Sequence, residues 1–201
     1  VYKRQVYTRA ELKKWFEELV SEYEKWARYQ MEWRAKRNAS IKTVEFPFEY
    51  RDGQKKLVAS VYRTILRKKK LFIQAPTGVG KTMAAVFPAV KAVGEELGEK
   101  IFYLTAKTIT RTVASQAFEI LRKQDLKMKV LTLTAKEKIC FCEETICNPD
   151  ACPYAKGHFD RVNAAVYELL TSTDEMSREV LEEQARKWNV CPFEMPLDVS
   201  Q

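Results

Sequence analysis

Long apolar runs are absent from this chain of 201 residues. No stretch approaches the roughly 18 to 20 consecutive apolar residues that a membrane-spanning helix needs. The charged N-terminal segment also lacks the apolar core and cleavage site of a secretory signal. These absences predict a cytoplasmic protein with no membrane partner. Its five cysteines are therefore expected to be free thiols or metal ligands rather than disulfides.

Histidine is nearly absent, and cysteine pairs of the CxxC type are missing altogether. We expect the single histidine, His158, to lie at the surface rather than to bind a metal. The cysteines all fall in the last third of the chain, at Cys140, Cys142, Cys147, Cys152 and Cys191. Zinc sites usually use CxxC pairs, whereas four thiolates around an iron-sulfur cluster tolerate irregular spacing better. The cysteine pattern therefore favours an iron-sulfur cluster.

Positive charge is in excess, with 35 Lys and Arg against 27 Asp and Glu, for a formal net charge of +8. This balance favours an acidic partner, and nucleic acid is the commonest one. The length suits one sizeable domain, or a domain with an insertion. Because the chain begins at Val1 and stops at Gln201 without a closing element, we interpret it as a fragment.

A phosphate-binding loop is the strongest motif. Residues 71–74 are apolar enough for a buried strand, and residues 83–93 favour a helix, which gives the order of strand, loop and helix that the motif requires. The predicted nucleotide contacts between them are Ala75, Pro76, Thr77, Gly78, Val79, Gly80, Lys81 and Thr82. The loop departs from the usual pattern only at its first glycine position, where Ala75 stands.

Each residue type in this loop has a physical role. Gly78 and Gly80 let several backbone N–H groups surround one anion. Lys81 adds a positive charge at the outer phosphates, and the Thr82 hydroxyl can bind Mg²⁺. We therefore predict Lys81 and Thr82 as the catalytic residues of this chain, with Mg²⁺ as a cofactor.

A second nucleotide signal lies upstream of the loop. Gln54 carries an amide that can pair with the N6 and N7 edge of adenine, and Phe48 or Tyr50 can stack on the base. The alternative is a solvated helix cap. Beside a phosphate loop, the combination predicts ATP as the nucleotide.

Two further strands are predicted, at residues 100–105 and 129–134. Together with the helices between them, they favour a parallel sheet covered by helices on both faces. Hydroxyls and cations follow these strands and suit phosphate contacts in an open α/β sheet, namely Lys107, Thr108, Thr110, Arg111, Lys136 and Lys138. The alternative for these residues is a solvated loop.

The two ends of the chain favour helices. A capping box formed by Thr8 and Glu11 predicts the start of a long helix that runs to about Ala39, with an aromatic stripe along one face. We interpret it as an arm that docks on the core or on a preceding domain. Helices at 159–171 and 177–188 could fold back and bring the last cysteine near the others.

Together these motifs resemble the superfamily 2 DNA helicases of the XPD/DinG type, which carry an iron-sulfur domain within the first motor domain. Residues 50–54 look like the adenine-reading Q motif, which adds Arg51 to the implied nucleotide contacts. Residues 75–82 resemble motif I. Residues 103–108 look like motif Ia, which in the family touches the backbone of single-stranded DNA. The nucleic-acid contacts predicted on this basis are Thr105, Lys107, Thr108 and Lys136.

The resemblance also implies a 4Fe-4S cluster. Residues 134–140 look like the segment that delivers the first ligand, and residues 191–193 look like the last ligand followed by proline and an aromatic. The implied ligands are Cys140, Cys147, Cys152 and Cys191. Cys142 is then the spare thiol and the alternative to Cys140 as first ligand.

The implied fold is α/β: a RecA-like parallel sheet forming part of motor domain 1, with a cysteine-rich iron-sulfur insertion and a long N-terminal helix. Residues 1–40 form the arm, 41–136 the first part of the motor domain, and 137–201 a cluster domain truncated at its C-terminal end. No acidic DEAH-type box follows an apolar strand. We therefore expect weak nucleotide binding and no appreciable hydrolysis by these residues alone.

In the complete protein, the resemblance implies an ATP-dependent helicase that acts as a monomer. It would use a second motor domain to move along single-stranded or forked DNA. Two other readings of the motifs stay open. A P-loop kinase would share the loop and the sheet, and a zinc-stabilised nucleic-acid-binding module would share the loop and the cysteines.

Overall fold

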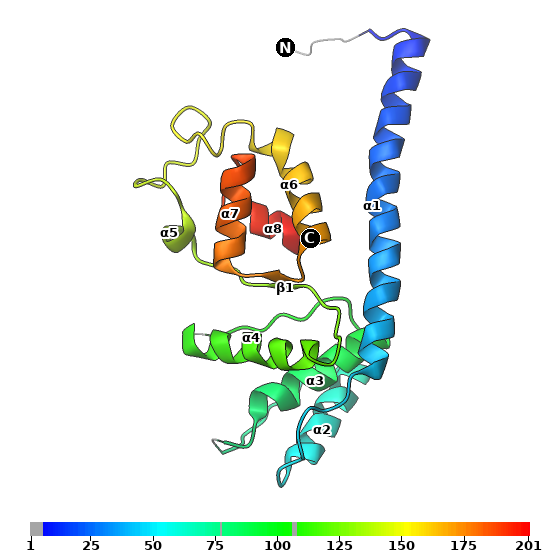
Figure 1. Cartoon of the computed structure of the whole chain (residues 1–201), viewed down its shortest axis with the longest axis vertical. Coiled ribbons are helices and arrows are strands. Elements are labelled where there is room, and N and C mark those ends of the chain that lie inside the picture. Colours follow the sequence, from blue (N-terminus) through cyan, green and yellow to red (C-terminus); the bar gives the residue numbers. More distant parts are fainter. Residues whose placement is uncertain (1–5, 77, 106–107) are drawn as a thin grey trace. The chain divides into compact units, whose positions relative to one another are not determined.

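The computed structural model describes residues 6–76, 78–105 and 108–201, and leaves the side chains of residues 108–111 undescribed. The chain divides into two compact units, Val1–Leu126 and Lys127–Gln201. The first unit holds α1 (Arg9–Thr43), α2 (Gln54–Leu66), α3 (Lys81–Gly94) and α4 (Thr108–Arg122) (Figure 1). The second holds β1 (Val130–Leu131), α5 (Lys136–Ile139), α6 (His158–Ser172), β2 (Glu175–Met176), α7 (Arg178–Trp188) and α8 (Glu194–Ser200). In the described ranges, no helix is both long and apolar enough to cross a membrane.

The capping box predicted for the long first helix is confirmed. The backbone N–H of Glu11 donates to Thr8 Oγ1 at 3.2 Å, and the backbone N–H of Thr8 donates to Glu11 Oε2 at 2.7 Å. α1 continues to Thr43, a little past its predicted end. Its N-terminal half exposes a row of large apolar side chains: Leu12, Trp15, Phe16, Leu19, Val20 and Tyr23. The docking of this arm on the core or on a preceding domain stays a prediction.

The core of the first unit forms around α3, which contacts α2, α1 and α4. Ile41 at the end of α1 and Val90 in α3 are almost completely buried. Lys91 Nζ donates to the carbonyl oxygens of Ile41 at 2.8 Å and Lys42 at 3.2 Å. A lysine at this position satisfies carbonyls that the end of a helix leaves without partners. These contacts fix the C-terminal end of the arm to the helix that follows the phosphate loop.

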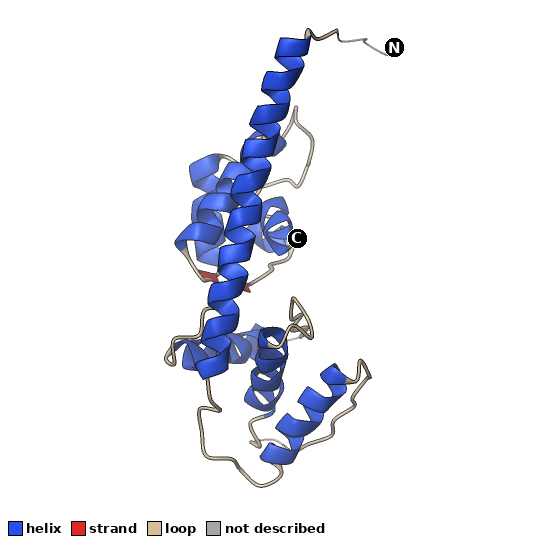
Figure 2. Ribbon diagram, turned by 90° about the vertical axis from the view of Figure 1, so that its right-hand side faces the viewer, coloured by secondary structure: helices blue, strands red, loops and turns tan. Residues whose placement is uncertain are grey.

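The predicted parallel sheet forms only in part. Residues 71–76 and 101–105 lie in neither a helix nor a strand, and their apolar side chains face solvent, with Phe72 92% and Leu104 88% exposed. A strand also requires backbone hydrogen bonds to a neighbouring strand, so an apolar composition alone does not determine one. Over the described ranges, the result is a mixed, mainly helical structure with one short strand pair (Figure 2).

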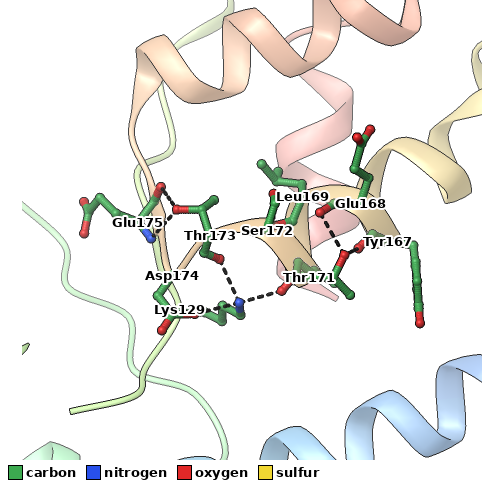
Figure 3. A network of polar contacts seen from close by, with 10 residues as sticks. Lys129, Tyr167, Glu168, Leu169, Thr171, Ser172, Thr173, Asp174 and Glu175 are labelled. Atoms are coloured by element: carbon green, nitrogen blue, oxygen red, sulfur yellow. Dashed lines mark hydrogen bonds and ion pairs between the residues drawn. The ribbon is translucent and has the colours of Figure 1, made fainter. Parts of the chain in front are cut away.

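The third predicted strand is shortened to β1, which pairs in parallel with β2. Lys129, just before β1, holds this arrangement through its ammonium group (Figure 3). It donates to the carbonyl oxygens of Leu170 at 2.5 Å and Thr173 at 2.7 Å, and to Asp174 Oδ1 at 2.7 Å. Asp174 therefore lies directly before β2, the strand that follows α6.

The two helices predicted in the second unit are confirmed as α6 and α7. Ser177 caps α7, because its side chain accepts a hydrogen bond from the backbone N–H of Val180. α6 packs against α7 and α8. Leu169, Leu181 and Met195, one from each helix, are buried at 1% exposure or less. This small core carries the turn that leads to the last cysteine.

Candidate functional site

A cavity of about 440 Å³ lies in the first unit at the N-terminal end of α3. Its lining comes from three parts of the unit: the loop before α2, the phosphate loop with the first turn of α3, and one face of α4. The residues are Phe48, Arg51, Gly78, Gly80, Lys81, Thr82, Met83, Val113, Gln116, Ala117 and Ile120. The structure thus brings together residues predicted for base stacking and for phosphate binding.

Left-handed backbone at two glycines shapes the loop at this cavity. Gly78 has φ +85° and Gly80 has φ +73°, and α3 begins directly after Gly80. The first N–H groups of a helix lack partners within the helix and carry its positive dipole end, which suits an anion. Thr77, predicted as a further contact, lies outside the described residues.

Lys81 folds back onto its own loop. Its Nζ donates to the carbonyl oxygens of Ala75 at 3.0 Å and Pro76 at 2.8 Å. An anion in the cavity would compete for the same ammonium, and ionic acceptors form the stronger hydrogen bonds. Thr82 lines the same cavity. The catalytic roles of Lys81 and Thr82 stay predictions.

Gln54 is 4% exposed, and its side-chain amide forms hydrogen bonds with the phosphate loop and with the turn before α2. Its Nε2 donates to the Val79 carbonyl oxygen at 3.0 Å, and its Oε1 accepts from the Arg51 backbone N–H at 3.1 Å. A Cβ at position 80 would lie 2.4 Å from Gln54 Nε2. The structure thus assigns Gln54 contacts with the phosphate loop, and its predicted contact with adenine stays a prediction.

The aromatic residues before α2 divide into two groups. Tyr50 stacks on Phe46 with ring centroids 4.3 Å apart, and Phe46 meets Phe87 of α3 edge-on at 5.4 Å. Phe48 is half exposed and lines the cavity. Arg51 also lines it and donates to the Gly78 carbonyl oxygen. Of the two predicted stacking residues, Phe48 is therefore the one that faces the cavity.

The four predicted nucleic-acid contacts fall in different settings. Thr105 is exposed, in the segment before α4 that lies in neither a helix nor a strand. Lys107 and the side chain of Thr108 lie outside the described residues. Lys136 begins α5 in the second unit, where its Nζ lies 3.4 Å from Cys147 Sγ and 4.9 Å from the ring centroid of Phe193. The hydrogen bond with the Cys147 thiol raises the pKa of Lys136.

All five cysteines are free thiols in the second unit. The sulfurs of Cys142 and Cys152 lie 3.9 Å apart. Partial burial and this contact raise the pKa of Cys142 to about 11. Burial also raises the pKa of Cys191, and the charge of Cys152 adds to the effect. Cys152 therefore lies near both Cys142 and Cys191.

These thiols do not surround a single metal ion. Within the described part of the chain, no three Cys, His, Asp or Glu side chains are grouped closely enough to hold one. A zinc ion requires four donors at about 2.0 to 2.3 Å from one point. The described side chains therefore do not form a metal site, and the iron-sulfur cluster stays a prediction.

His158 is 4% exposed, so the expectation of a surface position is wrong. Its Nδ1 accepts a hydrogen bond from the backbone N–H of Cys191 at 3.1 Å, and its Nε2 lies 3.5 Å from Asp198 Oδ2. Helical spacing was the signal that could have found this. His158 precedes the buried Val162 and Ala165 by four and seven residues, which places it on the apolar face of α6.

Comparison with known proteins identifies the class. Residues 52–164 match the DEAD/DEAH box helicase family, and this span covers more than half of the chain, which therefore belongs to that family. The chain is also 34% identical over 98 residues to a probable ATP-dependent helicase, MJ0942, of Methanocaldococcus jannaschii. That match covers 48% of this chain and 14% of the relative's length. No solved structure matches the chain.

Proposed function

We propose that this chain is part of an ATP-dependent DNA helicase that carries a 4Fe-4S cluster. The complete protein would couple ATP hydrolysis to movement along single-stranded DNA and to duplex unwinding. One observation carries the proposal: the cavity at the start of α3 combines Gly78, Gly80, Lys81 and Thr82 with an exposed aromatic side chain. Membership of a helicase family supports a role for this site in ATP-driven movement along nucleic acid.

The geometry supports a specific way of holding ATP. The phosphates would lie at the N-terminal end of α3, where the left-handed glycines expose backbone N–H groups. Lys81 would leave the loop carbonyls for the outer phosphates, and Thr82 would bind Mg²⁺. Phe48 would stack on the base, while Gln54 holds the phosphate loop through its hydrogen bond to the Val79 carbonyl oxygen. Arg51 lies beside the same loop at Gly78.

Single-stranded or forked DNA is the proposed polymer. The net charge of +8 favours a polyanion, and the proposed contacts are Thr105, Lys107, Thr108 and Lys136. We assign residues 1–40 to an arm, 41–136 to the first part of motor domain 1, and 137–201 to the cluster domain. A second motor domain elsewhere in a monomeric protein would complete the site for hydrolysis.

The proposed cluster ligands are Cys140, Cys147, Cys152 and Cys191. A bound cluster would join these four points of the chain and stabilise a unit in which long segments lack helix or strand. The segment between the first three of these cysteines consists of bends, turns and irregular structure, and most of its residues are exposed. Lys136 supports the assignment, because its ammonium lies against Cys147 and would offset the negative charge of a thiolate-bound cluster.

Binding of Mg-ATP by the intact chain tests the nucleotide site. We expect Lys81→Ala to weaken binding about tenfold or more, which is about 1.4 kcal/mol or more. Lys70→Ala is the matched control, since it removes an exposed lysine near the loop and should change affinity less than about twofold. Titration calorimetry of both variants gives the comparison. Equal affinity of parent and Lys81→Ala would contradict the proposed site.

The same chain should show no appreciable ATP turnover, with or without single-stranded DNA. Its described residues supply the phosphate loop, but the acidic box that positions Mg²⁺ and water in this family is absent from the sequence. A phosphate-release assay measures the turnover. DNA-stimulated hydrolysis by these 201 residues alone would refute the assignment of an incomplete motor domain.

A further inference from the structure

Two side chains of α6 contact the backbone of the last cysteine and of the residues just before it. Arg161 Nε donates to the Trp188 carbonyl oxygen at 3.0 Å, and its Nη2 donates to the Asn189 carbonyl oxygen at 2.6 Å. His158 Nδ1 accepts from the backbone N–H of Cys191 at 3.1 Å. Three of the four residues from 188 to 191 therefore have a backbone group held by α6.

The remaining residue of this turn is held by α7. The Val190 N–H donates to the Ala185 carbonyl oxygen at 3.0 Å, and the Val190 side chain is fully buried. Asn189 ends α7 with φ +50°, in the left-handed conformation that often closes a helix. Each residue from 188 to 191 thus has a fixed backbone group, which is unusual for a loop. The backbone of Cys191 is therefore held in a defined position at the end of this turn.

Arg161 also reaches the turn that contains Cys152. Its Nη2 donates to the Lys156 carbonyl oxygen at 2.7 Å. Lys156 closes that turn, because its backbone N–H donates to the Cys152 carbonyl oxygen at 3.1 Å. A Cβ at position 157 would lie 2.6 Å from Arg161 Nη1, so Gly157 leaves the space through which the guanidinium passes. One guanidinium group therefore joins two turns that each carry a proposed cluster ligand.

His158 is fixed in the orientation that this contact needs. It is buried at 4% exposure, and its own backbone N–H donates to the Ala155 carbonyl oxygen at 3.2 Å. Because Nδ1 accepts a hydrogen bond, the ring proton belongs on Nε2, which faces Asp198 Oδ2 at 3.5 Å. Residues that orient a metal ligand through hydrogen bonds are a recurring part of metal sites.

We infer that Arg161 and His158 are positioning residues that set the turns of Cys152 and Cys191 before a cluster binds. Neither residue is a proposed ligand. This inference rests on the cluster proposed above, but its structural content concerns only the chain itself. Holding two of the four ligands in place reduces the conformational freedom that cluster binding must remove. We call Arg161 and His158 together the clamp, and it should favour uptake of the cluster and slow its loss.

Cross-linking of the metal-free chain tests the clamp directly. The background variant has Ser in place of Cys140, Cys142 and Cys147, so Cys152 and Cys191 are the remaining thiols. The rate at which a short bismaleimide joins them reports how well their turns are held together. We expect Arg161→Met, which loses three hydrogen bonds, and His158→Leu, which loses the one to the Cys191 N–H, each to slow the reaction about fivefold or more.

Two further variants separate positioning from general stability. His158→Gln supplies an amide oxygen that can accept from the Cys191 N–H, so it should restore the rate to within about twofold of the parent. Glu168→Ala removes another α6 side chain that bonds Trp188 Nε1 and Gln184 Nε2 but no backbone group of residues 188–191. It should lower the melting temperature while leaving the rate within about twofold of the parent. Unchanged rates in Arg161→Met and His158→Leu, or an equal fall in Glu168→Ala, would overturn the inference.

Iron retention then separates this inference from the proposed function. For this measurement the chains keep all five cysteines. They are reconstituted with iron and sulfide without oxygen and then exposed to an iron chelator. We expect the visible absorption of Arg161→Met to decay about fivefold faster than that of the parent. A parent that takes up no iron would contradict the cluster alone. A parent that holds iron as briefly as Arg161→Met would contradict the clamp alone.

Discussion

Replacing Gly80 by alanine should damage the phosphate loop in a way that can be worked out from contacts. Gly80 has φ +73°, which is unfavourable for alanine by about 1 kcal/mol. The new Cβ would also lie 2.4 Å from Gln54 Nε2. Displacing that amide breaks its 3.0 Å hydrogen bond to Val79 and leaves a buried polar group without a partner, for about 1 to 3 kcal/mol. We therefore expect a total loss of about 2 to 4 kcal/mol of unfolding free energy.

Gly78→Ala is the matched control for this prediction. Gly78 has φ +85°, but nothing lies within 4 Å of a Cβ built there, so only the backbone term of about 1 kcal/mol applies. Urea unfolding gives both values. The double variant with Gln54→Ala should recover part of the Gly80→Ala loss, because the amide that clashes is gone. Equal destabilisation by the two glycine variants would refute the proposed contact between Gln54 and the loop.

Three further predictions concern the elements around the sites. Lys129→Met removes three hydrogen bonds and should lower the unfolding free energy by about 2 to 3 kcal/mol in urea; no change would contradict the network of Figure 3. Hydrogen bonds from Lys187 and Trp188 lower the pKa of Glu168 below its usual 4.5. The contribution of Glu168 to the unfolding free energy is therefore present above about pH 4.5 and lost as the pH falls through the lowered pKa. Glu168→Gln should make the unfolding free energy depend less on pH in this range, and an unchanged pH profile would contradict this prediction. Thr8→Ala should speed hydrogen exchange in the first turn of α1, through a loss of about 1 kcal/mol of capping energy.

Local sequence patterns predicted several helices and the phosphate loop. The capping box at Thr8 and Glu11, the helix after the phosphate loop and the two helices between Cys152 and Cys191 all depend on neighbours within a few residues. The loop itself is a local arrangement of glycine and lysine around a helix start. These features could be predicted because the interactions that decide them are encoded within one short segment.

Features that depend on distant partners were not predictable in the same way. The apolar segments 71–76 and 101–105 have the composition of buried strands, yet they lie in neither a helix nor a strand, because a strand also depends on a partner elsewhere in the sequence. The roles of Gln54 and Lys136 depend on contacts with residues 25 and 11 positions further along the chain. Nothing in their immediate sequence context distinguishes a nucleotide or DNA contact from a contact with a backbone carbonyl or a thiol.

Metal analysis of protein purified without oxygen tests the central claim most directly. Iron, zinc and acid-labile sulfide would be measured, with the visible spectrum, for the parent chain and for five variants that each change one cysteine to serine, at Cys140, Cys142, Cys147, Cys152 and Cys191. The proposed function predicts a brown parent with about four irons and four sulfides per chain. Every variant except Cys142→Ser should lose them. A colourless parent that holds zinc or no metal would contradict the cluster and leave only the nucleotide site to define the function.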